Sequence, residues 1–467
     1  MLKRVEIINK KVKVIGASIV ALVALALGGL TWYQHTHFNS QVTINGTKVG
    51  GLTADAALKK LRSVSLTNAI YLDGKLFYQG QKTAAGFTAS DLGAVKKVLK
   101  KQVTLFPTKA AKDYEIAPSK ISNYRKVTLK QELKAKLESE NLKRTKAQDA
   151  YAILKDGKVS VVPAKKGNQY DVAKILKEYD RISYSSDLNL RVQYLQPLSA
   201  ASQEVKTEQT KLAELAGRKV DYQVQDKHYE LKANEMLTSA RYVDGKYQFD
   251  TAALKNKVNE INQAQATLGK TFTFTTSTGK TIQVPGKTYG WALRDSDAIA
   301  SITKAYETGK TSLNAVNDIY GIGYLTYGTG YDTTLNGGLG NTYAEVSIAD
   351  QHVWLYKNGQ QVASIDVVTG KKSTGEDTPT GVWYIMYKQS PSVLRGSSAG
   401  SGSYEVKVNY WAQFTNSGCG FHDASWRKNW AKDAYISDGS GGCVNVKPSE
   451  MPNIYNNLSQ KEAVIIY

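Results

Sequence analysis

The chain has 467 residues and a formal net charge of +20 at pH 7. This length is too great for one ordinary core and indicates about three domains. Residues 341–467 contain 11 basic and 11 acidic residues, so the whole positive excess lies in residues 1–340. The chain has only two cysteines, Cys419 and Cys443, which excludes a disulfide-rich scaffold.

An uncharged segment near the start predicts a membrane anchor. Residues 14–33 (VIGASIVALVALALGGLTWY) carry no charge, and at about 1.5 Å per residue a helix of this length spans roughly the 30 Å hydrocarbon layer. Basic residues precede it, which keeps the N-terminus cytoplasmic and places the bulk of the chain outside the cell membrane. We assign residues 1–37 to a cytoplasmic tail and transmembrane anchor. The alternative is a cleaved signal peptide, because residues 24–26 (ALA) have the form of a cleavage site.

The location of the positive charge narrows the class of partner. A region outside a membrane is not expected to meet nucleic acid, and the sequence contains no recognised nucleic-acid-binding motif. Long-range attraction concentrates a basic protein near fixed negative charge, which favours anionic cell-wall polymers as partners. The other interpretation is a basic surface that serves solubility alone.

Residues 38–335 predict two α+β modules. Residues 41–46 alternate like a strand, and residues 53–61 have the pattern of a capped amphipathic helix. The spacing of residues 162–179 recurs in residues 284–306, with Pro163 and Pro285 lying 122 residues apart. We therefore place the two copies at residues 38–200 and 201–335. The charged stretch at residues 130–146 is expected to be a helix with a solvated face.

The last part of the chain predicts a mostly β domain at residues 341–467. Residues 327–340 are rich in glycine and threonine and predict a linker. Strands are expected at residues 345–348, 352–356, 362–368, 382–386 and 404–408. The expected fold class is therefore a multidomain chain with an N-terminal transmembrane helix, two α+β repeat modules and a mostly β C-terminal domain.

The small residues around Cys443 (GSGGCVN, residues 439–445) favour a nucleophilic thiol. Glycines leave the thiol open to approach and let backbone N–H groups come close to a reacting oxygen. A free cysteine is only a few per cent ionised at neutral pH, so a base must take its proton. The last third of the chain offers His352 and His422. We assign His422, because His352 lies in an alternating strand and is expected to pack or to face solvent.

The two cysteines allow two other interpretations, a disulfide and a metal site. Cys419 is expected to be a small core residue, and a disulfide between Cys419 and Cys443 would block the thiol. A zinc site that includes His422 has suitable Cys-x-x-His spacing, but Cys443 supplies no second close pair of ligands. We expect no metal and no cofactor.

Four segments together resemble the catalytic domain of YkuD-type L,D-transpeptidases: residues 344–359 (AEVSIADQHVWLYKNG), 378–381 (TPTG), 422–427 (HDASWR) and 439–445. The two upstream modules resemble the peptidoglycan-binding domains of Gram-positive members. The resemblance implies cross-linking of peptidoglycan stem peptides in cell-wall biogenesis and covalent reaction with carbapenems. Cys443 would attack the carbonyl of the third stem residue and release D-Ala, and an amine on a neighbouring stem would resolve the thioester.

The resemblance also implies roles for single residues. His422 would be the general base and acid, and the backbone carbonyl of Asp423 would orient it; a carboxylate role for Asp423 is the alternative. The N–H groups of Gly442 and Cys443 would hold the oxyanion, with Ser440 shaping the loop. The expected substrate-binding residues are Gly441, Asn445, Tyr410, Trp411, Trp426 and Arg427.

The sequence departs from the family pattern at Gly441, where members usually carry histidine. This puts thiolate stabilisation and placement of the oxyanion in doubt. Two alternatives to a transpeptidase therefore stay open. One is a catalytically impaired cell-wall-binding protein. The other is an L,D-carboxypeptidase, in which water resolves the thioester.

Overall fold

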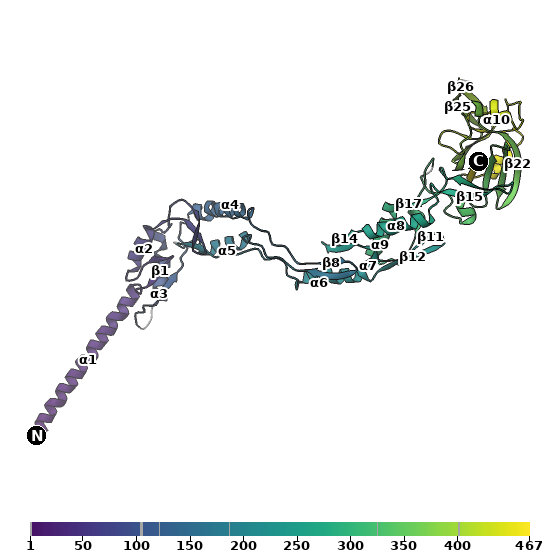
Figure 1. Ribbon diagram of the computed structural model, residues 1–467. Helices are drawn as coiled ribbons and strands as arrows, with labels where there is room; N and C mark the ends of the chain where they lie inside the picture. The colour runs from purple at the N-terminus through teal and green to yellow at the C-terminus, as the bar shows by residue number, and fades with distance from the viewer. Residues whose placement is uncertain (1, 103–105, 121, 186, 325, 400–401) are drawn as a thin grey trace. The chain divides into compact units, whose positions relative to one another are not determined.

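The computed structural model describes residues 2–102, 106–120, 122–185, 187–324, 326–399 and 402–467 (Figure 1). The chain divides into two compact units, residues 1–150 with 163–199 and residues 151–162 with 200–467. The elements of the first unit are α1 Leu2–Thr36, β1 Val42–Ile44, β2 Thr47–Lys48, α2 Ala54–Arg62, β3 Ser65–Leu66, β4 Ala69–Leu72, β5 Lys75–Gln79, β6 Thr83–Ala84, η1 Ala89–Asp91, α3 Leu92–Lys101, β7 Lys112–Tyr114, η2 Tyr124–Leu129, α4 Lys130–Asn141, α5 Val172–Ile182 and β10 Leu188–Leu190.

Helix α1 is, among the described residues, the one helix long and apolar enough to cross a membrane. The candidate span is Lys10–Thr36, and none of its most apolar window is buried against the rest of the protein. The remainder of the first unit has two separate cores. One is built on α2 and α3 and the other on α4 and α5.

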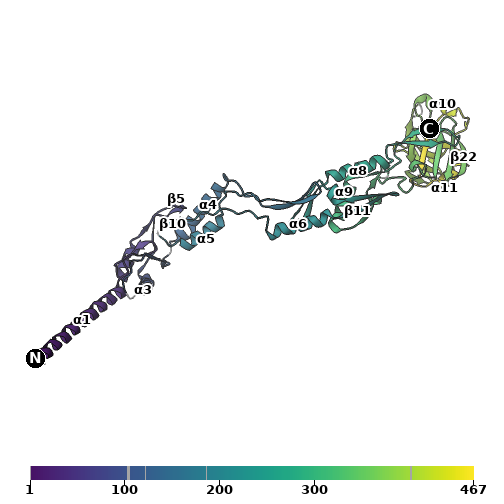
Figure 2. The same ribbon diagram turned by 60° about the horizontal axis from the view of Figure 1, so that its bottom comes forward.

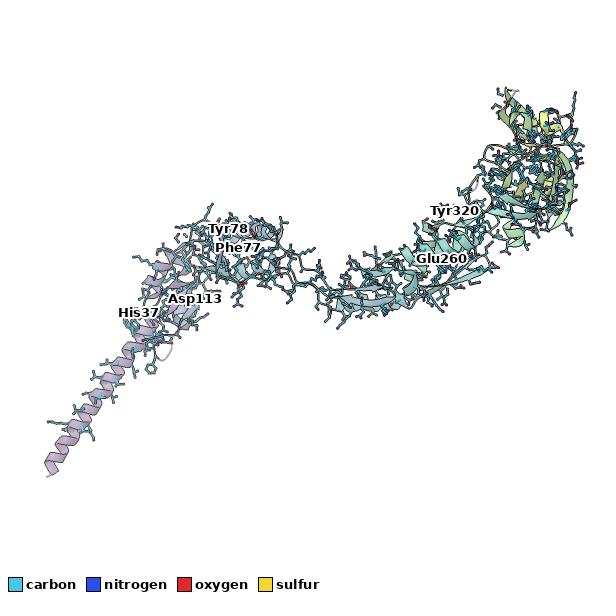
Figure 3. All side chains as sticks on the ribbon, in the orientation of Figure 1. His37, Phe77, Tyr78, Asp113, Glu260 and Tyr320 are labelled. Atoms are coloured by element: carbon cyan, nitrogen blue, oxygen red, sulfur yellow. The ribbon has the colours of Figure 1, made fainter. Side chains whose placement is uncertain are left out.

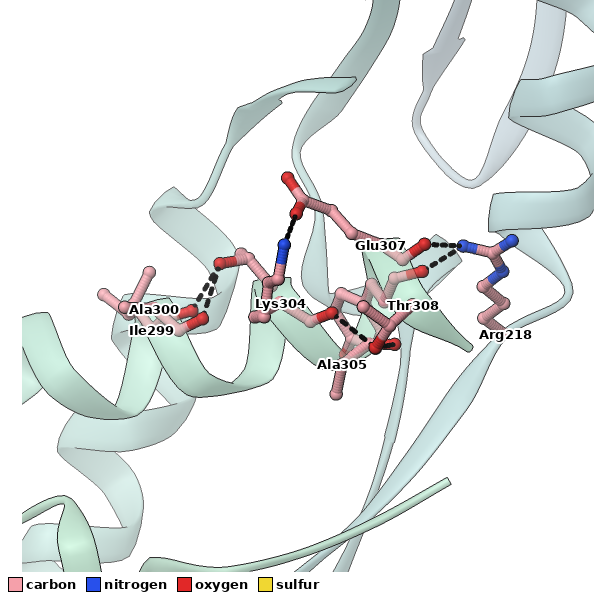
Figure 4. A network of polar contacts seen from close by, with 9 residues as sticks. Arg218, Ile299, Ala300, Lys304, Ala305, Glu307 and Thr308 are labelled. Atoms are coloured by element: carbon pink, nitrogen blue, oxygen red, sulfur yellow. Dashed lines mark hydrogen bonds and ion pairs between the residues drawn. The ribbon is translucent and has the colours of Figure 1, made fainter. Parts of the chain in front are cut away.

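The first part of the second unit is an α+β region. Its elements are β8 Tyr151–Lys155, β9 Lys158–Val162, α6 Gln203–Ala216, β11 Lys219–Val224, β12 Lys227–Lys232, α7 Ala233–Met236, β13 Ser239–Val243, β14 Lys246–Asp250, α8 Ala252–Gln265, β15 Thr271–Thr275, β16 Thr281–Pro285, β17 Ala292–Leu293, α9 Asp295–Thr308, β18 Ser312–Asn314 and β19 Ile319–Tyr320. Arg218 binds the C-terminal end of α9, where it donates to the carbonyls of Tyr306 and Glu307 (Figure 4). Cations near a helix C-terminus complement its dipole.

Three small sheets in the two units share one strand arrangement. In each, a strand pairs antiparallel with the next strand of the chain and parallel with a strand that follows a helix. The three sheets have the orders β2-β1-β7, β10-β4-β5 and β12-β11-β18. The antiparallel partners adjoin in sequence, whereas the parallel partner needs a crossover connection.

The β8–β9 hairpin lies in the second unit, although the expected boundary at residue 200 assigns it to the first module. Strand β8 pairs with β13 in a four-stranded sheet of order β14-β13-β8-β9. The backbone N–H of Ala152 donates to Glu208 of α6 at 2.8 Å, and the buried side chains of Ala152 and Leu154 join the core of this unit. The hairpin therefore completes a sheet and a core that residues 200–335 do not build alone.

Residues 327–340 pack closely on the second unit and are not the free linker expected from their composition. Tyr331 is buried edge-to-face against Trp291, with ring centroids 4.9 Å apart. A Cβ at Gly328 would lie 2.4 Å from the Cβ of Trp291. The glycine here permits close approach of the backbone to a core tryptophan.

The C-terminal domain is mostly β, as predicted. Its elements are β20 Tyr343–Ser347, β21 His352–Lys357, β22 Gln360–Val368, β23 Gly381–Tyr384, β24 Tyr387–Gln389, β25 Ser392–Ser398, β26 Gly402–Val408, β27 Trp411–Gln413, β28 Gly420–Asp423, α10 Ala434–Ser437, β29 Val444–Val446, α11 Met451–Asn457 and β30 Ala463–Ile466. A nine-stranded sheet has the order β23-β30-β20-β21-β22-β29-β28-β27-β24. Its core includes Phe414 and Phe421. Helix α11 packs against β21, β22 and β28, and Figure 2 labels α11 and β22. Strands β25 and β26 form a separate hairpin, which we call the flap.

Candidate active site

Two adjacent parallel strands bring the expected nucleophile and base to one side of the sheet. Strands β28 and β29 pair with His422 opposite Asn445, and Cys443 directly precedes β29. Successive side chains of a strand point to opposite faces, so Cys443 and Asn445 face the same side as His422. Phe421 and Val444 face the core on the other side.

The side chains of Cys443 and His422 line one pocket. The flap contributes Leu394, Tyr404 and Val406 to its wall. The remaining lining residues are Trp426, Arg427, Gly439, Ser440, Gly441 and Asn445. The pocket therefore combines a thiol, an imidazole and an apolar wall from the flap.

Hydrogen bonds fix the tautomer of the buried His422 ring. Nδ1 lies 3.0 Å from the backbone carbonyl of Asp423, and a carbonyl can only accept, so Nδ1 carries the proton. Nε2 is then the acceptor, and Asn445 Nδ2 donates to it at 3.1 Å. Burial lowers the pKa of His422 below its usual value. The ring is thus neutral near pH 7, with its basic nitrogen toward the pocket side.

Asn445 and Arg427, expected as substrate contacts, line the pocket and also hold the imidazole. Asn445 Oδ1 accepts from Arg427 Nε at 3.1 Å. Arg427 Nη1 in turn donates to the backbone carbonyl of Asp438 at 2.5 Å. A chain of hydrogen bonds therefore runs from the α10 region through Arg427 and Asn445 to His422. This positioning role was missed in the sequence, because it depends on strand register.

A backbone carbonyl binds the Cys443 thiol. Its S–H donates to the carbonyl of Gly418, with 3.7 Å between Sγ and oxygen. Burial raises the pKa of Cys443 to about 12; the nearby Cys419 thiol adds to this shift, and the Gly420 N–H partly offsets it. The described residues show no hydrogen bond between Cys443 and His422, whose Nε2 binds Asn445. The two side chains share the pocket without the contact that the sequence led us to expect.

The loop before Cys443 is held by its own hydrogen bonds. Ser440 Oγ donates to the carbonyl of Cys443 at 2.5 Å and accepts from the N–H of Gly442 at 3.1 Å. The Gly442 N–H, expected as an oxyanion donor, is thus engaged with Ser440. Gly442 has φ of 110°, and a Cβ there would lie 2.9 Å from Cys419 Sγ. Only glycine fits this position without strain.

The Asp423 carboxylate binds the turn before β27. It accepts from the backbone N–H groups of Asn409 and Tyr410 at 3.1 and 2.8 Å, and from Asn409 Nδ2 at 3.0 Å. The group that contacts His422 Nδ1 is the Asp423 backbone carbonyl. The geometry therefore favours the carbonyl over the alternative carboxylate role.

The aromatic residues around His422 have different surroundings. Trp426 is exposed and stacks near the imidazole, with centroids 5.7 Å apart at 25°. Trp411 is buried, with its centroid 5.9 Å from that of His422 and its Nε1 donating to Tyr387 at 3.2 Å. Tyr410 packs on Tyr455. Of the three aromatic residues expected as substrate contacts, only Trp426 lines the pocket.

Sequence reasoning missed the flap residues, since Leu394, Tyr404 and Val406 have the pattern of an ordinary solvated hairpin. The one sequence signal is a glycine opposite a tyrosine in the hairpin. Tyr404 pairs with Gly396, and a Cβ at Gly396 would lie 2.6 Å from the Tyr404 hydroxyl, so the ring lies across the glycine. Burial raises the pKa of Tyr404, and Cys443 adds to the shift.

The remaining candidates lie elsewhere. Cys419 is buried in the core of the sheet. His352 binds Asp366 and Ser364 of β22, at 2.8 and 2.7 Å, and does not line the pocket. Among the described residues no group of three His, Cys, Asp or Glu side chains could hold a metal ion.

Comparison with known proteins identifies the domain that carries this site. Residues 341–466 match the family model described as the L,D-transpeptidase catalytic domain (YkuD). The catalytic domain of the Enterococcus faecium L,D-transpeptidase is 35% identical over 27% of this chain and 96% of that one, with a TM-score of 0.25. The same domain acylated by ertapenem is 34% identical over 27% and 98%, with a TM-score of 0.26. A cysteine-to-serine mutant of the E. faecium L,D-transpeptidase is 26% identical over 55% of this chain and 98% of that one, with a TM-score of 0.43.

A search of curated proteins gave no match. The family model nonetheless identifies residues 341–466 as a catalytic domain of the YkuD-type L,D-transpeptidase family.

Proposed function

We propose that this L,D-transpeptidase cross-links peptidoglycan stem peptides through a thioester on Cys443. The observation that carries the proposal is the register of β28 and β29, which sets Cys443 and His422 on the same face of the sheet and in one pocket. The ertapenem-acylated E. faecium domain supports covalent acylation as the type of chemistry.

The first step is acylation of Cys443. The thiol leaves the Gly418 carbonyl by rotation about χ1, and its proton passes to His422 Nε2 as Asn445 Nδ2 releases that nitrogen. Sulfur then bonds to the carbonyl carbon of the third stem residue. The N–H of Cys443 stabilises the oxyanion, since the Gly442 N–H already donates to Ser440. The bond to the terminal D-Ala breaks, and His422 returns the proton to the leaving amine.

The second step is resolution of the thioester. An amine of a neighbouring stem attacks the thioester carbon and loses a proton to His422, and the Cys443 thiolate leaves and takes that proton. The apolar flap wall and the exposed ring of Trp426 favour an amine acceptor, because they restrict water around the thioester. The carboxypeptidase alternative differs only in that water attacks in place of the amine.

The experiment that tests the proposal uses the full chain in detergent. Intact-mass analysis with ertapenem should show one adduct on the parent and on Cys419→Ala, and none on Cys443→Ala. With a tetrapeptide donor and an acceptor stem, the parent should give dimers. Free tripeptide as the only product would establish the carboxypeptidase instead. An absence of both the adduct and any product would leave the wall-binding alternative.

We assign α1 the role of an anchor with the catalytic domain on the outer side of the membrane. The most apolar window of its candidate span is exposed all around, which suits lipid and not water. The helix continues without a break through residues 24–26, and His37, the residue after α1, accepts a hydrogen bond from Gln102, the residue after α3. This continuity favours an anchor over a cleaved signal peptide. Membrane-bound protein that retains residues 1–26 would support this role, and a mature N-terminus near residue 27 would contradict it.

The α+β regions between α1 and residue 335 are proposed to hold the cell wall as peptidoglycan-binding modules. Their shared sheet arrangement and the location of the positive charge support contact with a repeated, anionic polymer. Sedimentation of the Cys443→Ala chain with purified sacculi tests this role, and its wall retention should equal that of the parent.

A further inference from the structure

One face of α3 carries four exposed lysines. Lys96, Lys97, Lys100 and Lys101 are exposed, whereas Val95, Val98 and Leu99 on the opposite side are buried. The exposed residues include two lysine pairs at i and i+4, and such like-charge pairs oppose helix formation. These like-charge pairs lower the stability of α3, so the lysines do not serve to stabilise the helix.

The neighbouring helix α4 shows the ordinary arrangement. There Lys134 and Lys136 form i,i+4 ion pairs with Glu138 and Glu140. Within the described part of the chain, the α3 lysines have no such ion pair. The acidic side chains of this region bind elsewhere: Asp91 accepts from the backbone of Thr88 and Ser119, and Asp113 from that of Gly46.

The last turn of α3 is fixed beside the end of α1. Gln102, the residue after Lys101, donates through Nε2 to the carbonyl of His37 at 2.8 Å and accepts from the N–H of Asn39 at 2.8 Å. Figure 3 labels His37 at this junction. The ring of Tyr33 stacks on His37, with centroids 4.3 Å apart.

This junction lies at the depth of lipid headgroups if α1 is a membrane anchor. The apolar stretch of α1 ends at Tyr33, which the polar Gln34 follows. His37 follows four residues later, about 6 Å along the helix axis. The headgroup layer extends roughly 5–8 Å beyond the hydrocarbon on each side. Lys100 and Lys101 therefore emerge in that layer, and a lysine side chain readily extends its ammonium group along an interface.

We propose that the lysine face of α3 binds the phosphate groups of anionic phospholipids in the leaflet from which α1 emerges. The inference rests on the anchor role proposed for α1. A cluster of ammonium groups matches a layer of phosphates, and attraction to an anionic membrane surface acts within about a Debye length. The position of the face beside the end of α1 favours lipid over the more distant wall polymer. The contact would restrict how the first unit rotates above the membrane.

The test reconstitutes the full chain into nanodiscs of phosphatidylcholine alone or with about one third phosphatidylglycerol, which expose both leaflets. Lysine acetylation is followed by peptide mass spectrometry. We expect the α3 lysines to react roughly threefold more slowly in the anionic discs, and the protection to vanish at high salt. Four exposed lysines of the second unit serve as internal controls and should react equally in both discs: Lys206, Lys246, Lys255 and Lys310. Equal labelling of α3 in the two lipids would overturn the proposal.

Variants separate charge from fold. Hydrogen exchange of residues 92–102 should slow in anionic discs for the parent and for K96R/K97R/K100R/K101R, but not for K96Q/K97Q/K100Q/K101Q. The matched control K206Q/K246Q/K255Q/K310Q should behave as the parent. Protection by soluble polyphosphate combined with none by phosphatidylglycerol would assign the face to a polymer and overturn the lipid proposal. Incorporation of the chain into discs tests the anchor role of α1, and the ertapenem adduct tests the catalytic role of Cys443. A failure of either proposed function is therefore distinguished from a failure of the lipid contact.

Discussion

Asn445 Nδ2 donates to His422 Nε2 at 3.1 Å across two parallel strands in which these residues are register partners. The amide thus holds the nitrogen that must accept the thiol proton, while the Asp423 carbonyl holds the other nitrogen. In the resting site His422 Nε2 accepts a hydrogen bond from Asn445, and the Cys443 thiol donates to the carbonyl of Gly418. Proton transfer from Cys443 to His422 requires both of these hydrogen bonds to break.

Replacement of Asn445 should affect acylation through His422. Asn445→Ala removes the orienting amide, and we expect ertapenem acylation to slow by about 10- to 100-fold, as for other residues that orient a catalytic ligand. Asn445→Asp places a carboxylate beside the ring and raises the pKa of His422. The acidic limb of the acylation profile should then move to higher pH. An unchanged profile in Asn445→Asp would contradict the positioning role.

The reactivity of Cys443 should follow a strongly raised pKa. Because burial raises that pKa to about 12, the thiolate fraction, and with it the rate of iodoacetamide alkylation, should rise about tenfold per pH unit from pH 7 to pH 10. His422→Ala should keep this slope, since the resting thiol is not bonded to the imidazole. A plateau below pH 8 in the parent alone would instead indicate a thiolate–imidazolium pair.

Gly442→Ala should disrupt the loop that presents the nucleophile. The change forces a side chain into φ of 110° and against Cys419 Sγ, at a cost of about 1–3 kcal/mol in backbone strain alone. We expect a lower Tm and a large loss of ertapenem acylation. Adding Cys419→Ala relieves the contact but not the strain, so Tm should recover only in part.

Gly375→Ala is the matched control for this glycine. It has φ of 70° in the same domain, with nothing within 4 Å of a built Cβ. It should lower Tm modestly and leave acylation unchanged. A Gly442→Ala chain that acylates at the parent rate would show that the loop tolerates displacement.

Glu345 should be a stability residue. Its carboxylate is fully buried and accepts from the N–H and hydroxyl of Ser277 and from the hydroxyl of Tyr467. Glu345→Ala leaves these donors without their acceptor, and we expect unfolding in urea to become easier by about 2–4 kcal/mol. Glu345→Gln should cost less.

Glu405→Ala provides the comparison for Glu345. Its ion pair with Arg395 is exposed at both ends, and exposed pairs contribute about 0–1 kcal/mol. Near-equal midpoints for Glu345→Ala and Glu405→Ala would contradict the assigned role of Glu345.

The sequence predicted the features that depend on local pattern. The uncharged segment predicted a helix that could span a membrane, alternation predicted the β domain, and the small residues around Cys443 singled out a candidate nucleophile. It could not predict that Asn445 lies opposite His422, because register between strands distant in the chain is set by packing of the whole sheet. For the same reason the sequence could not predict that Gly442 N–H donates to the Ser440 hydroxyl or that Tyr404 lines the pocket.

The path of residues 151–162 also bears on how the enzyme could be released from its anchor. The chain leaves the first unit at residue 150, forms β8 and β9 in the second, and returns at residue 163 before crossing again at residue 199. A single cut between Ser199 and Ala200 would not release the second unit, because the N-terminal fragment would still contain β8 and β9, two strands of a sheet in that unit. Separating the two units where the chain passes between them needs three cuts or the extraction of that hairpin, so a single cut at this junction leaves the second unit attached to the anchored first unit.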